Sequence, residues 1–278
     1  MRTTLLLATD LDRTLIANGL HPESPRARPL FDRVVARPEV CLAYVSGRDF
    51  AMIQDAIREY LLPKPHFLVT DVGASIWTWE QGGWQRHTAW DAVIAPGWRG
   101  WSGERISSIL QGIVGIEKQE ESRQGLFKLS YYWFAQDQLE DIVREVVQRT
   151  RDHELQVDII WSQDEITGEG FLDVLPKGAS KLGAVRYLQR LGGFARERTV
   201  FSGDSGNDLD VLTSEIPAVL VGNAPEAVRQ KAIALSQSNG TSARLYLAKG
   251  AYGMNGYYSA GILEGLAHFI PETLAWIS

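Results

Sequence analysis

The sequence predicts an α/β protein in which a Rossmann-like, doubly wound parallel sheet forms the core and carries an inserted α+β cap domain. Three observations predict it. Short apolar runs recur along the chain, each followed by a turn of small or charged residues and then by a stretch with helical periodicity. Between about residues 84 and 170 this order gives way to mixed helix and strand patterns. With 278 residues and 45% hydrophobic content, the chain exceeds one average domain and can bury a large core.

The core is expected in two segments. Residues 1 to about 80 alternate strand, helix, strand, helix and strand, and the turn signal Gln81-Gly82-Gly83 follows them. The alternation resumes near Leu172. We therefore expect core segments at 1–82 and 172–278, around a cap domain at 83–171. Within the cap, helices are expected near 99–112 and 137–150, and strands at 127–133 and 154–161.

Two aspartates, Asp10 and Asp12, directly follow the first apolar run, Leu5 to Ala8. They leave the carboxyl end of a buried strand, where ligands of open α/β sheets bind. If the backbone stays extended, both carboxylates point to the same side and repel each other unless a cation lies between them or one of them holds a proton. A magnesium ion with a phosphoryl group would meet this need. For this triplet alone, the alternative is a solvated acidic loop.

Three further segments have the same placement between a strand and a helix. Ser46 lies where a hydroxyl and the free N–H groups of a helix start can cradle phosphate. Lys181 lies near a helix start, which is the unfavourable end of the helix dipole for a cation. A function would explain this position if its ammonium offsets the charge of Asp10 and of a phosphate. The alternative is a solvated lysine. Asp204 and Asp208 are four residues apart and share a helical face if the turn coils early.

In this order, the four segments resemble the four motifs of the haloacid dehalogenase (HAD) superfamily of phosphatases and phosphotransferases. The resemblance implies that Asp10 is the nucleophile, Asp12 the general acid/base and Lys181 the lysine that neutralises charge. The ion pumps of the superfamily have threonine at the position of Asp12. The resemblance therefore points to hydrolysis or phosphomutase chemistry.

The same resemblance implies a Mg²⁺ cofactor and a phosphate site. The implied metal-binding residues are Asp10, Asp12 through its backbone carbonyl, Asp204 and, in a supporting role, Asp208. The implied phosphate- and substrate-binding residues are Ser46, Gly47, Arg48 and Asn207.

Over nearly the whole chain the sequence is similar to the sucrose-phosphate phosphatase group of that superfamily. Further matching segments are 171–176, 203–208, 221–224 and 260–266. Arg13 stands where the usual motif has glycine, and Leu182 where glycine often follows the lysine. Lys128 matches a cap lysine that contacts sugar hydroxyls in that group, and strand alternation places it on the same face as Ser130 and Tyr132. A solvated strand lysine is the alternative.

The resemblance implies a magnesium-dependent phosphatase of a phosphorylated disaccharide or related glycoside, acting through an aspartyl-phosphate. The partner is then a small-molecule sugar phosphate. Another sugar phosphate, such as mannosyl phosphoglycerate, and a phosphomutase are the alternatives. A trypsin-like reading of Gly203-Asp204-Ser205-Gly206 is disfavoured because that fold is all-β and needs an activating histidine. A sugar-phosphate sensor is disfavoured because no catalytic carboxylate or lysine is missing.

Six of the nine tryptophans fall in the stretch that leads into the cap: 77, 79, 84, 90, 98 and 101. Their flat faces suit sugar rings, but they can equally pack the hinge and the cap core. Substrate choice is expected in the cap, which would also exclude water.

Composition excludes several other classes of protein. A net charge of −6 argues against nucleic acid, which binds basic surfaces. The apolar runs are too short for a membrane span or a signal peptide, so a cytoplasmic protein is the default expectation. Cys41 is the single cysteine and excludes an internal disulfide, and the five histidines lack zinc-site spacing. The sequence leaves the oligomeric state open.

Overall fold

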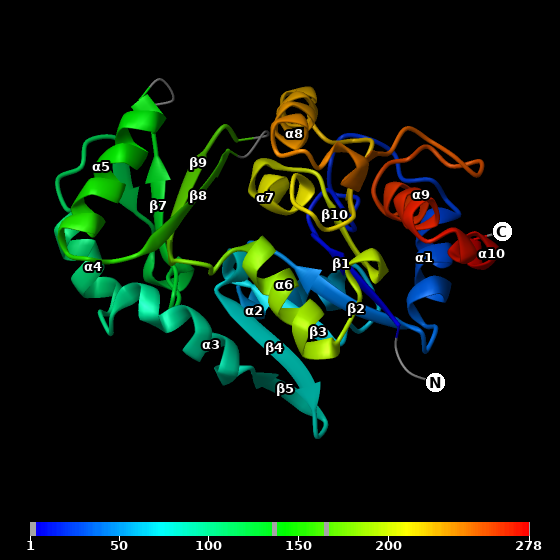
Figure 1. Ribbon diagram of the computed structural model, residues 1–278, viewed down its shortest axis with the longest axis horizontal. Helices are drawn as coiled ribbons and strands as arrows, with labels where there is room; N and C mark the ends of the chain where they lie inside the picture. The colour runs from blue at the N-terminus through cyan, green and yellow to red at the C-terminus, as the bar shows by residue number, and fades with distance from the viewer. Residues whose placement is uncertain (1–3, 135–137, 164–166, 278) are drawn as a thin grey trace.

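An eight-stranded sheet runs through the core lobe (Figure 1) in the computed structural model, which describes residues 4–134, 138–163 and 167–277. Its strand order is β12-β11-β10-β1-β2-β3-β4-β5. Neighbours from β12 to β3 pair in parallel, whereas β4 and β5 pair antiparallel. The strands are β1 (Leu5–Thr9), β2 (Val40–Val45), β3 (Phe67–Thr70), β4 (Ser75–Glu80), β5 (Gly83–Arg86), β10 (Thr199–Gly203), β11 (Ala218–Leu220) and β12 (Leu245–Leu247).

Helices cover both faces of this sheet because its strands are apolar on both sides. In β1, Leu5 and Leu7 pack into one hydrophobic cluster, and Leu6 and Ala8 into the other. The predicted doubly wound α/β fold is thereby confirmed. The first cluster includes α1 (Ala27–Val35), α2 (Phe50–Glu59), α9 (Ser259–Phe269) and α10 (Leu274–Ile277). The second includes α3 (Thr88–Ile94), α6 (Lys181–Gly192), α7 (Leu209–Leu212) and α8 (Glu226–Ser238).

The cap lobe is a four-stranded antiparallel sheet of order β6-β7-β9-β8, with two helices beside it (Figure 1). Leu129, Tyr131 and Trp133 of its second strand pack into the cap's own hydrophobic cluster, so Ser130 and Tyr132 point the other way. The cap elements are α4 (Gly103–Leu110), β6 (Ile116–Lys118), β7 (Leu129–Trp133), α5 (Leu139–Asp152), β8 (Val157–Gln163) and β9 (Gly170–Pro176).

The lobe boundaries differ from the expected ones. β5 pairs with β4, so the turn at 81–83 closes a hairpin of the large sheet and the chain has not yet left the core. Trp90 and Ile94 of α3 also pack on the core. At the other end, β9 pairs with β7 and β8 as far as Pro176. We therefore propose a cap of about residues 95–176.

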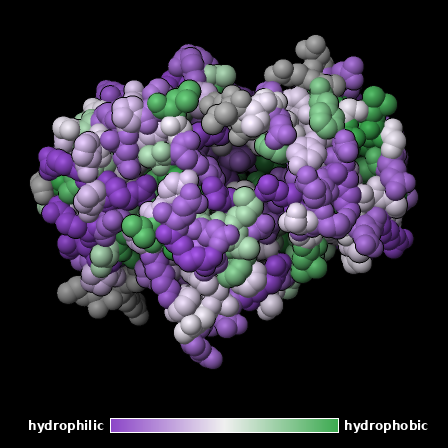
Figure 2. Space-filling view, turned by 180° about the vertical axis from the view of Figure 1, so that it is seen from behind, coloured by the Kyte–Doolittle hydropathy of each residue, from purple (hydrophilic) through white to green (hydrophobic). Residues whose placement is uncertain are grey.

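The described surface is mixed in character. On the face seen in Figure 2, hydrophobic residues are scattered among hydrophilic ones, as is usual for protein surfaces. Within the described ranges, no helix has both the length and the apolar character needed to cross a membrane.

Gly73, in the 3₁₀ turn Asp71–Gly73 after β3, lets that turn approach the start of α6 closely. Its φ is +112°, and a Cβ there would lie 2.2 Å from the carbonyl carbon of Ser180. The indole Nε1 of Trp90 donates to the Gly73 carbonyl at 3.0 Å. This contact therefore fixes the position of Lys181, which follows Ser180 directly.

We expect Gly73→Ala to destabilise the protein more than Gly82→Ala, a matched control with φ of +83° and nothing within 4 Å of the added Cβ. The free energy of unfolding of the Gly82→Ala control should fall by about 1–2 kcal/mol, because a side chain is strained at positive φ. Gly73→Ala should lose about 1–3 kcal/mol more, because its Cβ meets backbone atoms. Urea unfolding of both variants measures the difference, and equal losses would contradict the close approach.

Candidate active site

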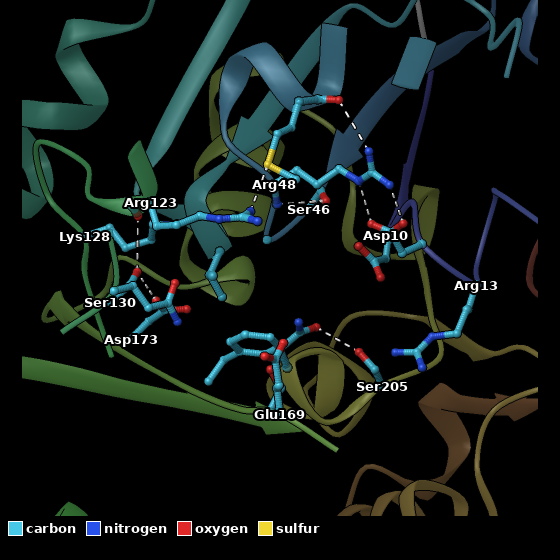
Figure 3. Close-up of a pocket in the computed structure, with 18 of the residues that line it drawn as sticks. Asp10, Arg13, Ser46, Arg48, Arg123, Lys128, Ser130, Glu169, Asp173 and Ser205 are labelled. Carbon is cyan, nitrogen blue, oxygen red and sulfur yellow. Dashed lines mark hydrogen bonds and ion pairs between the residues drawn. The ribbon is translucent and has the colours of Figure 1, made fainter. Parts of the chain in front are cut away.

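A cavity of about 300 Å³ lies between the two lobes, at the carboxyl edge of the parallel strands. The predicted core residues that line it come from loops after β1, β2 and β10, and Figure 3 shows Asp10, Ser46 and Arg48 among them facing the cap side chains. The core wall comprises Asp10, Asp12, Arg13, Ser46, Gly47, Arg48, Met52, Val72, Asp204, Ser205 and Asn207. The cap wall comprises Gln119, Arg123, Lys128, Ser130, Tyr132, Ser162, Glu169, Phe171 and Asp173.

Lys181 joins two of the predicted carboxylates. It is the first residue of α6, and its side chain is 1% exposed. Its Nζ lies 3.0 Å from Asp10 Oδ1 and donates to Asp208 Oδ1 at 2.7 Å. Burial lowers the pKa of Lys181, but these two carboxylates raise it above its ordinary value. The lysine is therefore a fixed buried cation, and the alternative of a solvated lysine is wrong.

Asp208 caps the turn that carries Asp204. Its Oδ2 accepts hydrogen bonds from the backbone N–H groups of Asp204 and Ser205 at 3.1 and 3.0 Å. The turn coils as a 3₁₀ helix over Gly206–Asp208, which meets the condition of early coiling set for the spacing of Asp204 and Asp208. Gly203 is required here, since a Cβ would lie 2.5 Å from Asp208 Cγ. Both oxygens of Asp208 are thus engaged within the protein.

The carboxylates of Asp10, Asp204 and Asp208 lie close enough to share a metal ion. One oxygen from each falls in a group whose members are within 4.8 Å of one another, and all three residues are buried. Asp204 Oδ1 accepts from Thr14 Oγ1 at 2.9 Å. Its Oδ2 is buried without a hydrogen bond in the described residues, with Arg13 Nε 3.4 Å away. Mg²⁺ prefers oxygen ligands, so three neighbouring carboxylates, one of which has an oxygen without a hydrogen bond, suit this ion.

The electrostatics of this group favour a bound cation. Burial raises the pKa of Asp10 to about 7, although Lys181 lowers it, and Asp208 and Asp12 raise it further. Burial and the charges of Asp10 and Asp208 raise the pKa of Asp204 well above its ordinary value. The protein thus holds two carboxylates in a place where ionisation is costly without added positive charge.

Asp12 has a different environment from Asp10. Arg48 donates to both its oxygens, from Nε at 2.8 Å and from NH2 at 2.6 Å, and Asn18 Nδ2 donates at 2.8 Å. Burial raises the pKa of Asp12, but Arg48 and Asn18 outweigh it, so the pKa lies below its ordinary value. The expected contact of Arg48 with substrate and the expected metal contact of the Asp12 carbonyl both stay predictions.

Ser46 lies at the floor of the cavity, 1% exposed, and its Oγ accepts from the Arg48 N–H at 3.2 Å. Gly47 lies opposite Asn207, whose Nδ2 would be 4.0 Å from an added Cβ. The loop is tied to the next strand, because Asp71 N–H donates to the Arg48 carbonyl at 2.9 Å. These residues meet as the sequence predicted, and their role in phosphate binding stays a prediction.

On the cap wall, Lys128, Ser130 and Tyr132 line the cavity together, which confirms their predicted common face. Lys128 is buried, and its Nζ lies 3.3 Å from Asp71 Oδ1 of the core, so it is not a solvated lysine. Asp173 is the register partner of Ser130, and burial raises its pKa while Lys128 lowers it.

Sequence reasoning missed Asp71, Asp173 and Asn18. Asp71 follows β3 at the same carboxyl edge as the recognised motifs, and this placement could have identified it. Asp173 and Asn18 depend on strand register and loop path, which the sequence does not display. The six tryptophans, all of them described, are absent from the cavity lining. Five of them pack in or against the hydrophobic clusters, as Trp90 does in the core and Trp98 in the cap, whereas Trp79 is 39% exposed.

This fold, with this set of side chains at the carboxyl edge of its sheet, defines a phosphatase of the HAD superfamily, a class of phosphoric monoester hydrolases. The chain belongs to the family described as sucrose-6F-phosphate phosphohydrolase, whose sequence model matches residues 3–270.

Individual relatives agree with this assignment. The chain is 46% identical to a HAD-like hydrolase of Nitrosococcus oceani over all of its length and 75% of that protein's. It is 29% identical to a mannosylfructose-phosphate phosphatase of Agrobacterium fabrum, over 82% of this chain and 87% of that protein. It spans about half of a tobacco sucrose-phosphatase, at 25% identity.

A solved structure shares the fold. The sucrose-phosphatase of Synechocystis, in complex with sucrose and phosphate, superposes with a TM-score of 0.77 at 24% identity, covering 97% of this chain and 98% of that one.

We expect the thermal stability of the metal-free protein to fall as pH rises from about 5.5 to about 8. In the unfolded state Asp10 loses its proton near the ordinary pKa of an aspartate, whereas in the folded state its pKa is about 7. Between these two values the folded state holds a proton that the unfolded state has released, so rising pH favours unfolding until the folded group also ionises. Mg²⁺ should therefore raise the melting temperature more at the higher pH.

Melting curves with chelator and with Mg²⁺ at the two pH values measure this effect. Asp204→Asn, which removes one buried carboxylate, should melt higher than the wild type with chelator at the higher pH and respond less to Mg²⁺. A Mg²⁺ response that is equal at both pH values would argue against ionisation of these carboxylates as the cause.

Proposed function

We propose that the protein is a magnesium-dependent phosphatase that hydrolyses a phosphorylated disaccharide or related glycoside through an aspartyl-phosphate intermediate. The observation that carries this proposal is the shared cavity, in which Asp10, held from behind by the buried Lys181, lies at the core wall while polar side chains line the cap wall. One wall suits a phosphoryl group, and the other suits a sugar.

In this proposal, Asp10 attacks phosphorus and Asp12 handles protons. Asp10 Oδ1 is held by Lys181, which fixes the direction of the carboxylate and offsets its charge. Asp12 protonates the departing sugar oxygen in the first displacement and accepts a proton from water in the second. While Arg48 is in place, the lowered pKa of Asp12 keeps its carboxylate ionised, so it can accept a proton but has none to donate. Bound phosphate must therefore draw Arg48 away before Asp12 can act as an acid.

Phosphate binding is assigned to Ser46, Gly47 and Asn207, which line the cavity with Asp10, and to the charge of Lys181 beside Asp10. The hydroxyl of Ser46 and the neighbouring backbone N–H groups suit the phosphoryl oxygens. Lys181 supplies positive charge that is already desolvated, so it needs little reorganisation during the reaction.

The metal is assigned to Asp10 and Asp204, with Asp208 as a positioning residue that holds Lys181 and the turn of Asp204. The unsatisfied Oδ2 of Asp204 is the observation in favour of this fit. When bound, Mg²⁺ supplies positive charge at the phosphoryl oxygens. The chain's own contribution is to present oxygens and to exclude water with the cap.

The cap wall favours a neutral polyhydroxyl leaving group over an acidic one. It mixes donors and acceptors, as sugar hydroxyls require, and carries two carboxylates, Glu169 and Asp173. The charge of Lys128 is already balanced by Asp71. Beside them the wall carries one further cation, Arg123, so a glycerate carboxylate would meet a wall on which carboxylates outnumber the remaining positive charge. Two relatives, a mannosylfructose-phosphate phosphatase and part of a glucosylglycerol-phosphate synthase, have neutral glycosides in their names.

The direct test is phosphate release across a panel of sucrose 6-phosphate, mannosylfructose phosphate, glucosylglycerol phosphate, mannosyl phosphoglycerate and glucose 6-phosphate, with Mg²⁺ and with chelator. We expect a neutral glycoside phosphate to be turned over best, and activity to require Mg²⁺. Asp10→Asn is the matched control and should lower turnover at least about 10³-fold, because the nucleophile is removed. Full activity in chelator or in Asp10→Asn, or a preference for mannosyl phosphoglycerate, would contradict the proposal.

We expect Lys128→Ala to reduce kcat/KM for the preferred glycoside phosphate about 10- to 150-fold, because a charged hydrogen bond to the sugar is lost. Turnover of p-nitrophenyl phosphate, which has no sugar, should change much less. Lys118→Ala, a cap lysine paired with Glu121 outside this cavity, is the control and should affect neither substrate. Equal losses on both substrates would mean that Lys128 mainly ties the cap to Asp71.

A further inference from the structure

Arg13 occupies a position in the metal-binding loop where its backbone conformation favours glycine. Its φ is +55°, in the left-handed region that is costly for a residue with a Cβ. Two hydrogen bonds hold this backbone: the Arg13 N–H donates to Asn18 Oδ1 at 2.8 Å, and Asn223 Nδ2 donates to the Arg13 carbonyl at 2.6 Å. The loop is thus fixed, and the arginine side chain projects from it into the cavity (Figure 3).

The guanidinium of Arg13 faces the unsatisfied oxygen of Asp204. Arg13 Nε lies 3.4 Å from Asp204 Oδ2, while Thr14 satisfies Oδ1. The side chain of Asp204 is 2% exposed and that of Arg13 is 22% exposed. The separation is that of an ion pair, and Oδ2 has no hydrogen bond within the described residues. Arg13 therefore offsets the charge of the buried Asp204 carboxylate, while Asp204 Oδ2 accepts no hydrogen bond within the described residues.

A divalent cation held by Asp10 and Asp204 would need this same oxygen. A positive charge held at ion-pair distance from that oxygen would repel the cation. We propose that Arg13 is a built-in counter-ion of Asp204, which a divalent cation must displace in order to bind. Arg13 then stabilises the metal-free protein and weakens its affinity for Mg²⁺. This inference rests on the proposed function, because it takes Asp204 as a metal ligand.

The structure provides space for the displaced guanidinium. Arg13 lines the active-site cavity and also a second cavity of about 530 Å³ between β8 of the cap and α8 of the core. Ser205 and Asn207 line both cavities as well. The second cavity thus adjoins Arg13 and offers room for a guanidinium that leaves Asp204.

Calorimetric titration of metal-free protein with Mg²⁺, in the absence of substrate, tests the proposal. Arg13→Gln should bind Mg²⁺ about 10-fold more tightly than the wild type, because the competing charge is gone. Its melting temperature with chelator should be lower than that of the wild type. Arg123→Gln removes the same charge from the cap wall of the same cavity and should leave the affinity for Mg²⁺ unchanged. Arg13→Gly, which suits the positive φ, is the second variant and should bind as tightly as Arg13→Gln.

The outcomes separate this inference from the proposed function. Tighter binding by both Arg13 variants, with Arg123→Gln unchanged, supports it. Unchanged or weaker binding by the Arg13 variants overturns it while leaving the magnesium site intact. Equal tightening in Arg123→Gln overturns it in favour of a general effect of cavity charge. A wild type that binds no Mg²⁺ overturns the magnesium-dependent function and this inference together.

Discussion

The buried contact of Lys181 with Asp10 and Asp208 is the constraint on which the rest of the site depends. A lysine that is 1% exposed must be paired, and its two carboxylates come from the end of β1 and from the turn after β10. These strands are hydrogen-bonded neighbours in parallel register, which brings their carboxyl ends together. Gly73 and Gly203 permit the close backbone approaches that place α6 and Asp208 around this point.

In the proposed function, the core carries out the chemistry and the cap selects the substrate. The core supplies oxygens whose ionisation is costly without a cation, a fixed ammonium and a serine hydroxyl. The cap supplies side chains of both hydrogen-bonding kinds from alternate positions of β7 and β9. The ion pair of Lys128 with Asp71 links the two lobes directly at the cavity. In the proposed function, this pair of charges couples the position of the cap to recognition of the leaving group.

The sequence predicted the parts of this structure that local patterns encode. Apolar runs followed by turns placed Asp10, Ser46 and Asp204 at one edge, because parallel strands bring their carboxyl ends together whatever the loops do. Lys181 follows β9, an antiparallel cap strand, and meets Asp10 from the start of α6. It did not predict Asp71 as the partner of Lys128, which depends on how a cap strand meets a core loop. The cap boundaries that we propose differ from the expected ones because β5 continues the large sheet through its pairing with β4, and because β9 pairs with β7, about 40 residues earlier in the chain. The pairing of Arg48 with Asp12 joins loops far apart in the sequence.

The most direct measurement of the central claim is the identity of the phosphorylated residue during turnover. Rapid acid quench of the Mg²⁺-loaded enzyme with its best glycoside phosphate, followed by peptide mass spectrometry, should show an acid-stable, base-labile phosphoryl group on Asp10. Phosphorylation of a serine or of another aspartate would contradict the account. So would turnover at a normal rate with no phosphoenzyme under conditions in which its formation outpaces its hydrolysis.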